Sequence, residues 1–223
     1  MRFLPHLGFY VFIYYFAFSC PLFAQENLST LPAQIILEPH MVSIILNDEH
    51  RDGVDWEAIV SDFHSLVLKK DEDATDNKTK LSVGTVSDED YSVLLDALDA
   101  VGQIKQSIKE PVTVVADMPT TIPFVGVEAK NAISIDAELT VTTNGGKKLK
   151  LSPEVMGKVG STTIEIKANS TIVLGSIFYE HEVTKTHKFP LLGDLPIVGL
   201  VFRNKGKLMQ KIETIIFLTP KGN

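Results

Sequence analysis

The sequence predicts a mainly β fold with one or two helices, and three observations carry this prediction. Residues 133–142 alternate apolar and polar side chains, and residues 148–152 alternate again after an Asn144-Gly145-Gly146 turn. Residues 35–46 are rich in β-branched and aliphatic side chains, which favour strands. A single segment has a clear helical repeat. We therefore expect strands joined by turns, with the helix packed on a sheet.

The first 24 residues have the composition of an export signal. Arg2 is their only charged residue, residues 7–18 are nearly all apolar, and Leu22-Phe23-Ala24 is a suitable cleavage site. The apolar run is shorter than the roughly 20 residues of a membrane-spanning helix. Two alternatives to cleavage after residue 24 stay open. The segment could remain as an uncleaved anchor, or Cys20 could carry a lipid at a processed N-terminus.

The composition excludes several classes of protein. The formal net charge is −7 and the chain has no basic stripe, which argues against nucleic acid as a partner. The single cysteine cannot form a disulfide within the chain, so an exported form depends on packing or oligomerisation for its stability. Residues 25–34 read as a polar leader, and no later segment is a candidate transmembrane helix.

The first elements after the leader follow from local composition. We expect the strand at 35–46 to bend or bulge at Pro39, because proline cannot donate a backbone hydrogen bond. An acidic turn follows, and then Trp56, which we expect to lie in the core. Residues 69–80 are charged or polar apart from one alanine, which predicts a solvated loop. A calcium site is the alternative there, with oxygen ligands from three aspartates, Asp71, Asp73 and Asp76.

The predicted helix covers residues 87–101. Ser87 can cap its N-terminus, the acidic residues at 88–90 suit the positive end of the helix dipole, and Gly102 can end it. Its apolar residues recur at helical spacing and form one face: Tyr91, Leu94, Leu95, Leu98 and Val101.

The second half of the chain predicts further strands. Residues 111–126 read as strand, turn and strand, and the hairpin described above follows. Its alternation fits a sandwich and a barrel with a wet lumen equally well. We expect residues 163–167 and 171–178 to pair with each other around a short turn, and residues 179–188 to form a polar loop.

The sequence lacks the motifs of the common enzyme classes. It has no Gly-x-Ser-x-Gly elbow, Walker A loop, His-Glu-x-x-His motif or cysteine pair. His181 and His187 have no carboxylate at helical ligand spacing, so we interpret them as surface residues. The chain is predicted not to be an enzyme and to carry no cofactor and no metal.

Residues 189–203 do not have the composition of an ordinary surface loop. Most of them are large and apolar, yet two prolines and two glycines prevent a long helix or a central strand. Connecting segments normally run over the protein surface and expose their backbone. Something apolar must therefore cover this segment, whether the protein's own core, another subunit or lipid.

This segment resembles the signature of the bacterial secretins, the outer-membrane channels of type II and III secretion, type IV pili and filamentous phage export. The similar residues read Pro-Leu-Leu-Gly-Asp-Leu-Pro-Ile-Val-Gly from Pro190, and the match ends in Phe202 and Arg203. In that family a short polar spacer and a final apolar strand ending in Thr-Pro come next. Residues 204–211 and 212–220 are similar to these two segments.

Earlier segments resemble the same family. A strand leading to Gly-Val-Asp-Trp at 53–56, the Leu-Leu-Asp-Ala-Leu pattern at 94–98 and the Ile-Pro-Phe-Val-Gly segment at 122–126 all have similar counterparts. One departure lies at Gly175, where the family has a Gly-Gly pair and this chain continues with Ser176. The resemblance covers the chain from about residue 35.

The resemblance implies a secretin-type β-domain over residues 35–220, with a tail at 221–223, whose strands close into a large barrel on oligomerisation. It implies a subunit of a homo-oligomeric, gated outer-membrane channel for protein secretion or pilus export. Its partners would be further copies of itself, outer-membrane lipid, periplasmic secretion or pilus machinery and a pilot lipoprotein. The alternative is a non-conducting periplasmic or lipid-anchored β-domain that assembles with another envelope complex.

The resemblance also implies two sets of functional residues. The first set is a membrane-contacting lip made of Phe189, Pro190, Leu191, Leu192, Gly193, Asp194, Leu195, Pro196, Ile197, Val198, Gly199, Leu200, Phe202 and Arg203. The second set is a gate that closes the channel, made of Pro123, Phe124, Gly126, Val127, Glu128 and Lys130.

Overall fold

The computed structural model describes residues 32–70, 79–125, 132–188 and 203–221. All of these except Pro32 belong to one compact unit that begins at Ala33. The signal peptide, most of the leader, the aspartates of the alternative calcium site and the lip from 189 to 202 lie outside the described residues. The predictions made for them therefore stay predictions.

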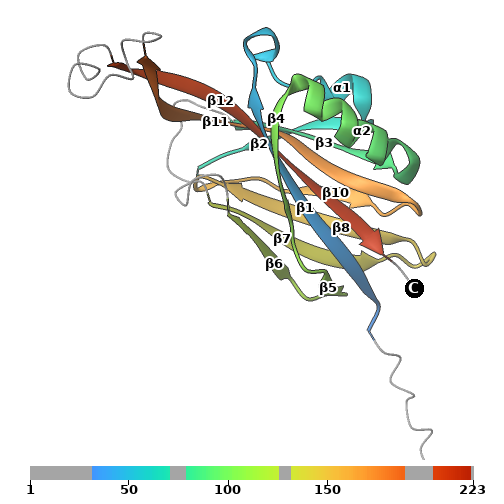
Figure 1. Cartoon of the computed structure of the whole chain (residues 1–223). Helices are drawn as coiled ribbons and strands as arrows, with labels where there is room; N and C mark the ends of the chain where they lie inside the picture. Colours follow the sequence, from blue (N-terminus) through green and yellow to red (C-terminus); the bar gives the residue numbers. More distant parts are fainter. Residues whose placement is uncertain (1–31, 71–78, 126–131, 189–202, 222–223) are drawn as a thin grey trace, which may run out of the picture. The chain divides into compact units, whose positions relative to one another are not determined.

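The larger of two antiparallel sheets has the strand order β2-β3-β11-β12-β1-β4, and β5 also pairs with β1 (Figure 1). The last strand of the chain lies next to the first. The bounds are β1 Gln34–Leu46, β2 Ser61–Leu68, β3 Thr79–Ser87, β4 Gly102–Ile108, β5 Val112–Val115, β11 Ser170–Lys188 and β12 Arg203–Lys221.

The smaller sheet has the order β10-β8-β7-β6, and β9 pairs with β8. The predicted hairpin is confirmed, since β7 pairs with β8 in a register that places Leu139 opposite Leu149. The strand, turn and strand predicted at 111–126 correspond to β5 and β6. The bounds are β6 Thr120–Val125, β7 Ala132–Val141, β8 Lys147–Val155, β9 Lys158–Val159 and β10 Thr162–Glu165.

The apolar faces of the two sheets pack against each other. One cluster of buried residues joins Ile216 and Leu218 of the larger sheet to Ile135 and Leu149 of the smaller sheet. Of the two arrangements that the alternation of β7 allows, the structure shows a sandwich within one chain. A sheet that buries one face and wets the other alternates apolar and polar residues in this way.

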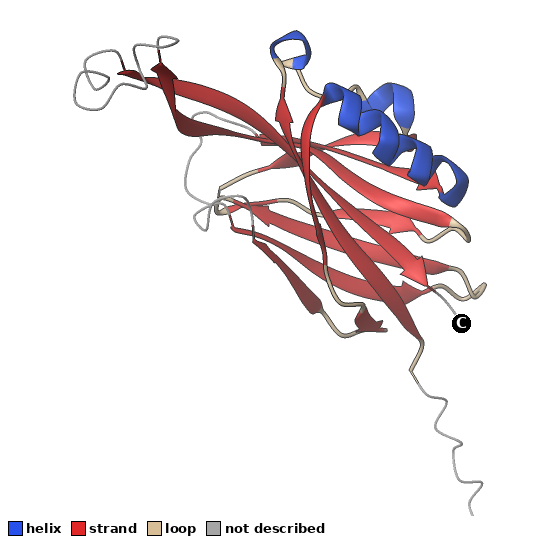
Figure 2. Cartoon of the chain, in the orientation of Figure 1, coloured by secondary structure: helices blue, strands red, loops and turns tan. Residues whose placement is uncertain are grey.

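Helices cover the other face of the larger sheet, and Figure 2 separates them from the strands by colour. Helix α2, Asp88–Val101, packs Leu94 and Leu98 in the same cluster as Phe217 of β12. Since β12 is covered on both faces, residues 215–218 are all fully buried and form an uninterrupted apolar run. The shorter helical segments are η1, Asp48–His50, and α1, Trp56–Ile59. The predicted class, mainly β with few helices, is confirmed.

The predicted helix and its signals are confirmed. The Ser87 side chain accepts a hydrogen bond from the Asp90 backbone at the N-cap, and the helix ends before Gly102. In the layer between α2 and the sheet, His40 Nδ1 of β1 lies 2.6 Å from Tyr91 Oη. Burial lowers the pKa of the His40 imidazole and raises the pKa of Tyr91 to about 12.

Three predictions about strands are wrong. Residues 163–167 and 171–178 do not pair with each other, because β10 pairs with β8 whereas β11 pairs with β3 and β12. Residues 179–188 and 204–211 are strand rather than loop and spacer. Lys80 belongs to β3 rather than to a solvated loop.

Pro39 produces no register shift in the pairing of β1 with β12, so the predicted bulge is absent. The pairing of β1 with β12 runs continuously through Pro39, which lies opposite Leu218. On the other side of β1, Leu37 is the last residue paired to β5 and His40 is the first paired to β4. Pro39 is tolerated because its missing N–H coincides with the break between these two partners.

Candidate functional site

The hairpin of β11 and β12 flanks the predicted lip. Lys188 of β11 pairs with Arg203 of β12, so the ladder reaches both ends of the segment that carries the signature. Residues 180–188 and 203–211 form nine pairs, and among the described strands they pair only with each other. We call these two segments the ribbon. In Figure 1 the ribbon continues the hairpin beyond the neighbouring strands.

The ribbon exposes apolar and charged side chains together. Leu208 and Met209 are 44% and 46% exposed, and they lie opposite Val183 and Glu182. Glu182 Oε1 and Lys207 Nζ form an ion pair 2.8 Å long, which at this exposure contributes about 1 kcal/mol at most. None of residues 180–184 and 207–211 is buried within one chain. Neither of these two segments therefore has a buried face within one chain.

A buried glutamate lies at the root of the ribbon, by which we mean the point where β12 passes from the ribbon into the larger sheet. Glu213 of β12 is fully buried and accepts three hydrogen bonds from N–H groups. Oε1 accepts from Trp56 Nε1 at 2.8 Å and from the Ser176 backbone at 3.2 Å, and Oε2 accepts from the Val54 backbone at 2.9 Å. Burial raises the pKa of the Glu213 carboxyl, although these three hydrogen bonds and the charge of Lys211 favour the ionised form.

The turn that leads into α1 packs closely on this glutamate. A Cβ atom on Gly53 would lie 2.6 Å from Glu213 Oε2 and 2.6 Å from the Phe178 ring, so only glycine fits there. Lys211 Nζ donates to the Arg51 carbonyl oxygen at 2.7 Å and lies 4.4 Å from the centroid of the Phe178 ring. Residues 51–56 therefore hold the root of the ribbon through several contacts.

The described part of the predicted gate lies on β6. Phe124 is 2% exposed, and Pro123 pairs with Ser134 of β7. Lys109, which follows β4 of the larger sheet, donates through Nζ to the Pro123 carbonyl oxygen and lies 5.2 Å from the centroid of the Phe124 ring. Lys109 thus fixes the strand that leads into the rest of the predicted gate. The remaining gate residues, Gly126, Val127, Glu128 and Lys130, lie outside the described residues.

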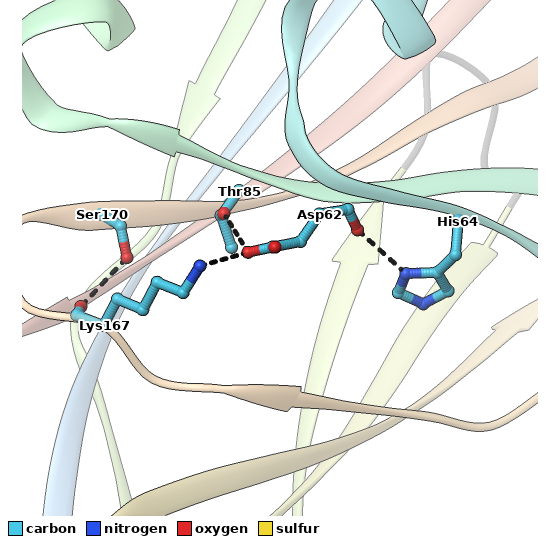
Figure 3. A network of polar contacts seen from close by, with 5 residues as sticks. All are labelled: Asp62, His64, Thr85, Lys167 and Ser170. Carbon is cyan, nitrogen blue, oxygen red and sulfur yellow. Dashed lines mark hydrogen bonds and ion pairs between the residues drawn. The ribbon is translucent and has the colours of Figure 1, made fainter.

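A polar network joins the two sheets at another place, as Figure 3 shows. Asp62 of β2 pairs with Lys167, which follows β10, and accepts from Thr85 Oγ1 at 3.5 Å. The Lys167 ammonium lowers the pKa of the Asp62 carboxyl. His64 Nε2 lies 2.7 Å from Thr162 Oγ1. The network connects β2 to the β10 region through largely exposed side chains, so we interpret it as a structural contact.

The described part of the chain contains neither a cluster of metal ligands nor a membrane-spanning helix. There, no three His, Cys, Asp or Glu side chains are grouped so as to hold a metal ion. The same residues include no helix with the length and hydropathy to span a bilayer. His181 and His187 lie on β11, opposite Gln210 and Asn204, rather than in the predicted loop.

Residues 120–221 match the family model of the secretins, described as bacterial type II and III secretion system proteins. The match begins at β6, includes the segment with the predicted lip, and ends with β12. Residues 120–221 belong to the bacterial secretin family. This secretin domain contains both strands of the ribbon, the gate strand β6 and the buried Glu213. Membership in the family also confirms the prediction that the chain is not an enzyme.

Two curated relatives illustrate the extent of the similarity. The "DNA utilization protein HofQ" of Escherichia coli strain K12 is 33% identical over 113 residues, which cover 43% of this chain and 27% of that protein. The "Type IV pilus biogenesis and competence protein PilQ" of Neisseria meningitidis serogroup A is 34% identical over 61 residues, which cover 27% of this chain and 8% of that protein. The secretin chain therefore matches no more than about a quarter of either relative's length.

Solved secretin structures align with most of this chain at low identity. The type II secretion system secretin XcpQ of Pseudomonas aeruginosa is 14% identical, with a TM-score of 0.33, and the alignment covers 87% of this chain and 60% of that chain. The secretin PilQ of the Vibrio cholerae type IV competence pilus is 17% identical, with a TM-score of 0.28, and the alignment covers 88% of this chain and 62% of that chain.

Sequence reasoning missed two residues of this site. Glu213 carried a usable signal, because it is a charged residue inside the apolar run from Ile212 to Leu218, where a buried carboxylate needs partners. Lys109 carried no such signal in the sequence, because a lysine between two short strands is ordinary. Its contact with Pro123 depends on how the two sheets pack.

Proposed function

We propose that this secretin is a subunit of a homo-oligomeric, gated outer-membrane channel for protein secretion or pilus export. The observation that carries the proposal is the ribbon. Its nine residues per strand lie beside the secretin signature, and among the described strands its outer edges have no partner. A strand that crosses a bilayer at a tilt needs about 9–11 residues, so the ribbon has a suitable length for the wall of a barrel.

Unpaired edges need a partner, and a ring of identical subunits supplies one. An exposed strand edge presents free N–H and C=O groups that pair with other chains. A closed barrel removes the edges altogether and is the sheet arrangement that satisfies every backbone group in lipid. Edge-to-edge pairing of ribbons from neighbouring copies would build such a barrel, in which each subunit contributes the same surface.

The lip would contact the membrane at the end of the ribbon. Residues 189–202 connect two strands that are paired up to Lys188 and Arg203. The nine ladder pairs of the ribbon separate this apolar connection from Tyr179 and Ile212, where the buried residues of the domain begin. Outer-membrane lipid is therefore the apolar environment that we propose for the lip.

The gate would lie between β6 and β7, in the smaller sheet. Gly126 gives the backbone freedom to turn, and residues 127–130 are few and mostly small or charged, which suits a segment that projects into a water-filled channel. The contact of Lys109 with Pro123 and Phe124 holds the entry to this segment against the larger sheet. The gate would thus be attached to the channel wall through β6.

The proposed location is the outer membrane, reached by export with a cleaved signal peptide. The proposed partners are further copies of the chain, outer-membrane lipid, periplasmic secretion or pilus machinery and a pilot lipoprotein. A relative named for type IV pilus biogenesis and a family model described for type II and III secretion fit either system. We therefore propose the channel class and not a particular cargo.

Deleting residues 127–130 should open the channel without preventing its assembly. A channel wide enough for protein would leak unless it is closed at rest, so cells with the shortened chain should become sensitive to vancomycin. The measurement is the inhibitory concentration in cells that carry equal amounts of wild-type or mutant rings. Conductance of the purified proteins in planar bilayers should rise in parallel.

The control is Met156→Asp, which changes an exposed residue in the β8–β9 turn of the same sheet. It should leave both readouts at the wild-type value. Unchanged vancomycin sensitivity in the deletion strain, with rings present in the outer membrane, would mean that these residues do not form the gate.

One observation favours the alternative of a non-conducting β-domain. The apolar faces of the two sheets already cover each other within one chain, so the described domain buries its core without a ring. Such a domain would assemble with another envelope complex and would give no conductance in the bilayer experiment, even after deletion of the gate segment.

A further inference from the structure

A β-bulge in β11 lies four residues before the ribbon begins. Leu174 pairs with Ile216 and Ile177 pairs with Thr214, so Gly175 and Ser176 together lie opposite a single residue of β12. The pairing of β11 with β3 also ends at Gly175. A bulge bends its strand and increases the local twist. This bulge therefore lies where β11 loses β3 as a neighbour, and it contributes to the direction of the hairpin beyond it.

The bulge is conformationally strained and needs support. Ser176 has a φ of 62°, in the left-handed region that residues other than glycine rarely adopt. Gly175 is pressed against Trp56, since a Cβ atom at this position would lie 2.6 Å from two atoms of the indole ring. The Ser176 hydroxyl lies 2.8 Å from the Ser82 hydroxyl of β3. Contacts from two other segments thus fix the two bulge residues.

Glu213 is the residue that connects these supports. The bulge frees the Ser176 N–H from the ladder, and Glu213 Oε1 accepts it together with the Trp56 Nε1–H. The other carboxylate oxygen accepts from Val54 in the turn before α1. One buried side chain therefore joins the bulge to a separate segment of the chain, residues 54–56, close to where the ribbon begins.

We propose that Glu213 positions the hairpin, because its carboxylate locks the bulge at Gly175 and Ser176 to residues 54–56 and so fixes the angle at which the ribbon leaves the sheet. This inference rests on the proposed function only for its consequence, which is that every subunit of a ring presents its lip in the same direction. The angle itself is a property of one chain and can be measured without a channel.

Replacing Glu213 with glutamine tests this positioning role with little change in the shape of the side chain. A carboxylate has two acceptor oxygens, whereas an amide has one oxygen and one NH2 group. Whichever way the amide turns, at least one of the three N–H donors then faces another donor. We expect Glu213→Gln to leave the sandwich folded and to let the ribbon sample a range of angles.

The measurement is a distance distribution between two spin labels in the full chain. The labels are attached through Leu208→Cys on the ribbon and Val93→Cys on α2, at positions that are 44% and 66% exposed. Cys20→Ser removes the native cysteine, and dilution with unlabelled chain removes distances between subunits. The parent chain should give one narrow distribution. Glu213→Gln should broaden it by about twofold, because the bulge loses the contact that fixes its bend.

Glu182→Gln is the matched control, since it neutralises an exposed glutamate on the ribbon and should leave the distribution unchanged. Trp56→Phe is a second test variant, because it removes one donor and keeps an aromatic ring against Gly175. A distribution as narrow as that of the parent chain in the folded variants would overturn the proposal. Loss of the folded sandwich in both variants would also overturn it, because a positioning role leaves the sandwich intact.

The outcome is separable from that of the channel experiment. A gate-deleted chain that conducts nothing in bilayers would contradict the proposed channel and leave this inference intact. A parent chain with a broad distance distribution would contradict this inference and leave the channel intact.

Discussion

Replacing Leu195 or Val198 with aspartate is expected to abolish insertion of the protein into the outer membrane while the sandwich stays folded. A charge that faces lipid costs about 2–4 kcal/mol near the midplane of the bilayer and less at its surface. A symmetric ring repeats this cost in every subunit, so the total exceeds what a few lost apolar contacts would cost. Membrane fractionation measures insertion, and circular dichroism of the same variants measures folding.

Val93→Asp is the control, because Val93 is an exposed apolar residue on α2 and lies far from the lip in sequence. It should leave both insertion and folding unchanged. If the segment 189–202 were soluble core instead of lip, Leu195→Asp and Val198→Asp would unfold the domain. An unfolded variant chain would therefore count against the lip.

Trp56→Ala is expected to destabilise the domain by about 3–5 kcal/mol, the usual cost of truncating a large buried aromatic side chain. Trp56 is 2% exposed and its ring fills the space beside Gly175. The substitution also deprives Glu213 of one of its three donors, which leaves a buried carboxylate less well satisfied. Urea unfolding followed by circular dichroism measures the change, since the chain has no second tryptophan for fluorescence.

Met118→Ala provides the comparison, because Met118 is 60% exposed. Surface truncations of this kind change the free energy of unfolding by about 0.5 kcal/mol or less. A loss below about 1 kcal/mol for Trp56→Ala would show that the indole ring is not the support of the bulge that its contacts indicate.

Local signals predicted the elements whose stability depends on local chemistry. The helix at 88–101 has a serine cap, acidic residues in its first turn and a glycine at its end, and the cap and the end are used in the structure as predicted. The β7–β8 hairpin has an alternating pattern because one face meets the other sheet. Trp56 was expected in the core and lies there.

The wrong predictions concern segments whose structure depends on which strands pair with each other and not on the burial of one face. The polarity of residues 179–188 predicts a loop and the resemblance implies a spacer at 204–211, yet a two-stranded ribbon satisfies its backbone whether or not a face is buried. β10 pairs with the nearby β8, whereas β11 pairs with the distant β3 and β12, and the short turn between β10 and β11 conceals this change of sheet. The sequence around Pro39 could not reveal that a break between two partner strands would accommodate it.

The candidate site was predictable only in part. The lip and the gate follow from resemblance, and the described residues reach Arg203 on one side of the lip and Pro123 and Phe124 at the entry of the gate. The contacts that join the bulge to the root of the ribbon depend on three segments, around residues 54, 176 and 213, that are far apart in sequence. No single segment contains that information.

Copies of this chain are expected to close into a ring in the outer membrane. The most direct measurement is to extract outer membranes with detergent, separate the protein on a gel with and without heating, and image the same extract by negative-stain microscopy. We expect a high-mass species that resists detergent on the gel, and we expect rings with a central opening in the micrographs. A monomer in the soluble periplasmic fraction, with no rings in the membrane extract, would contradict it.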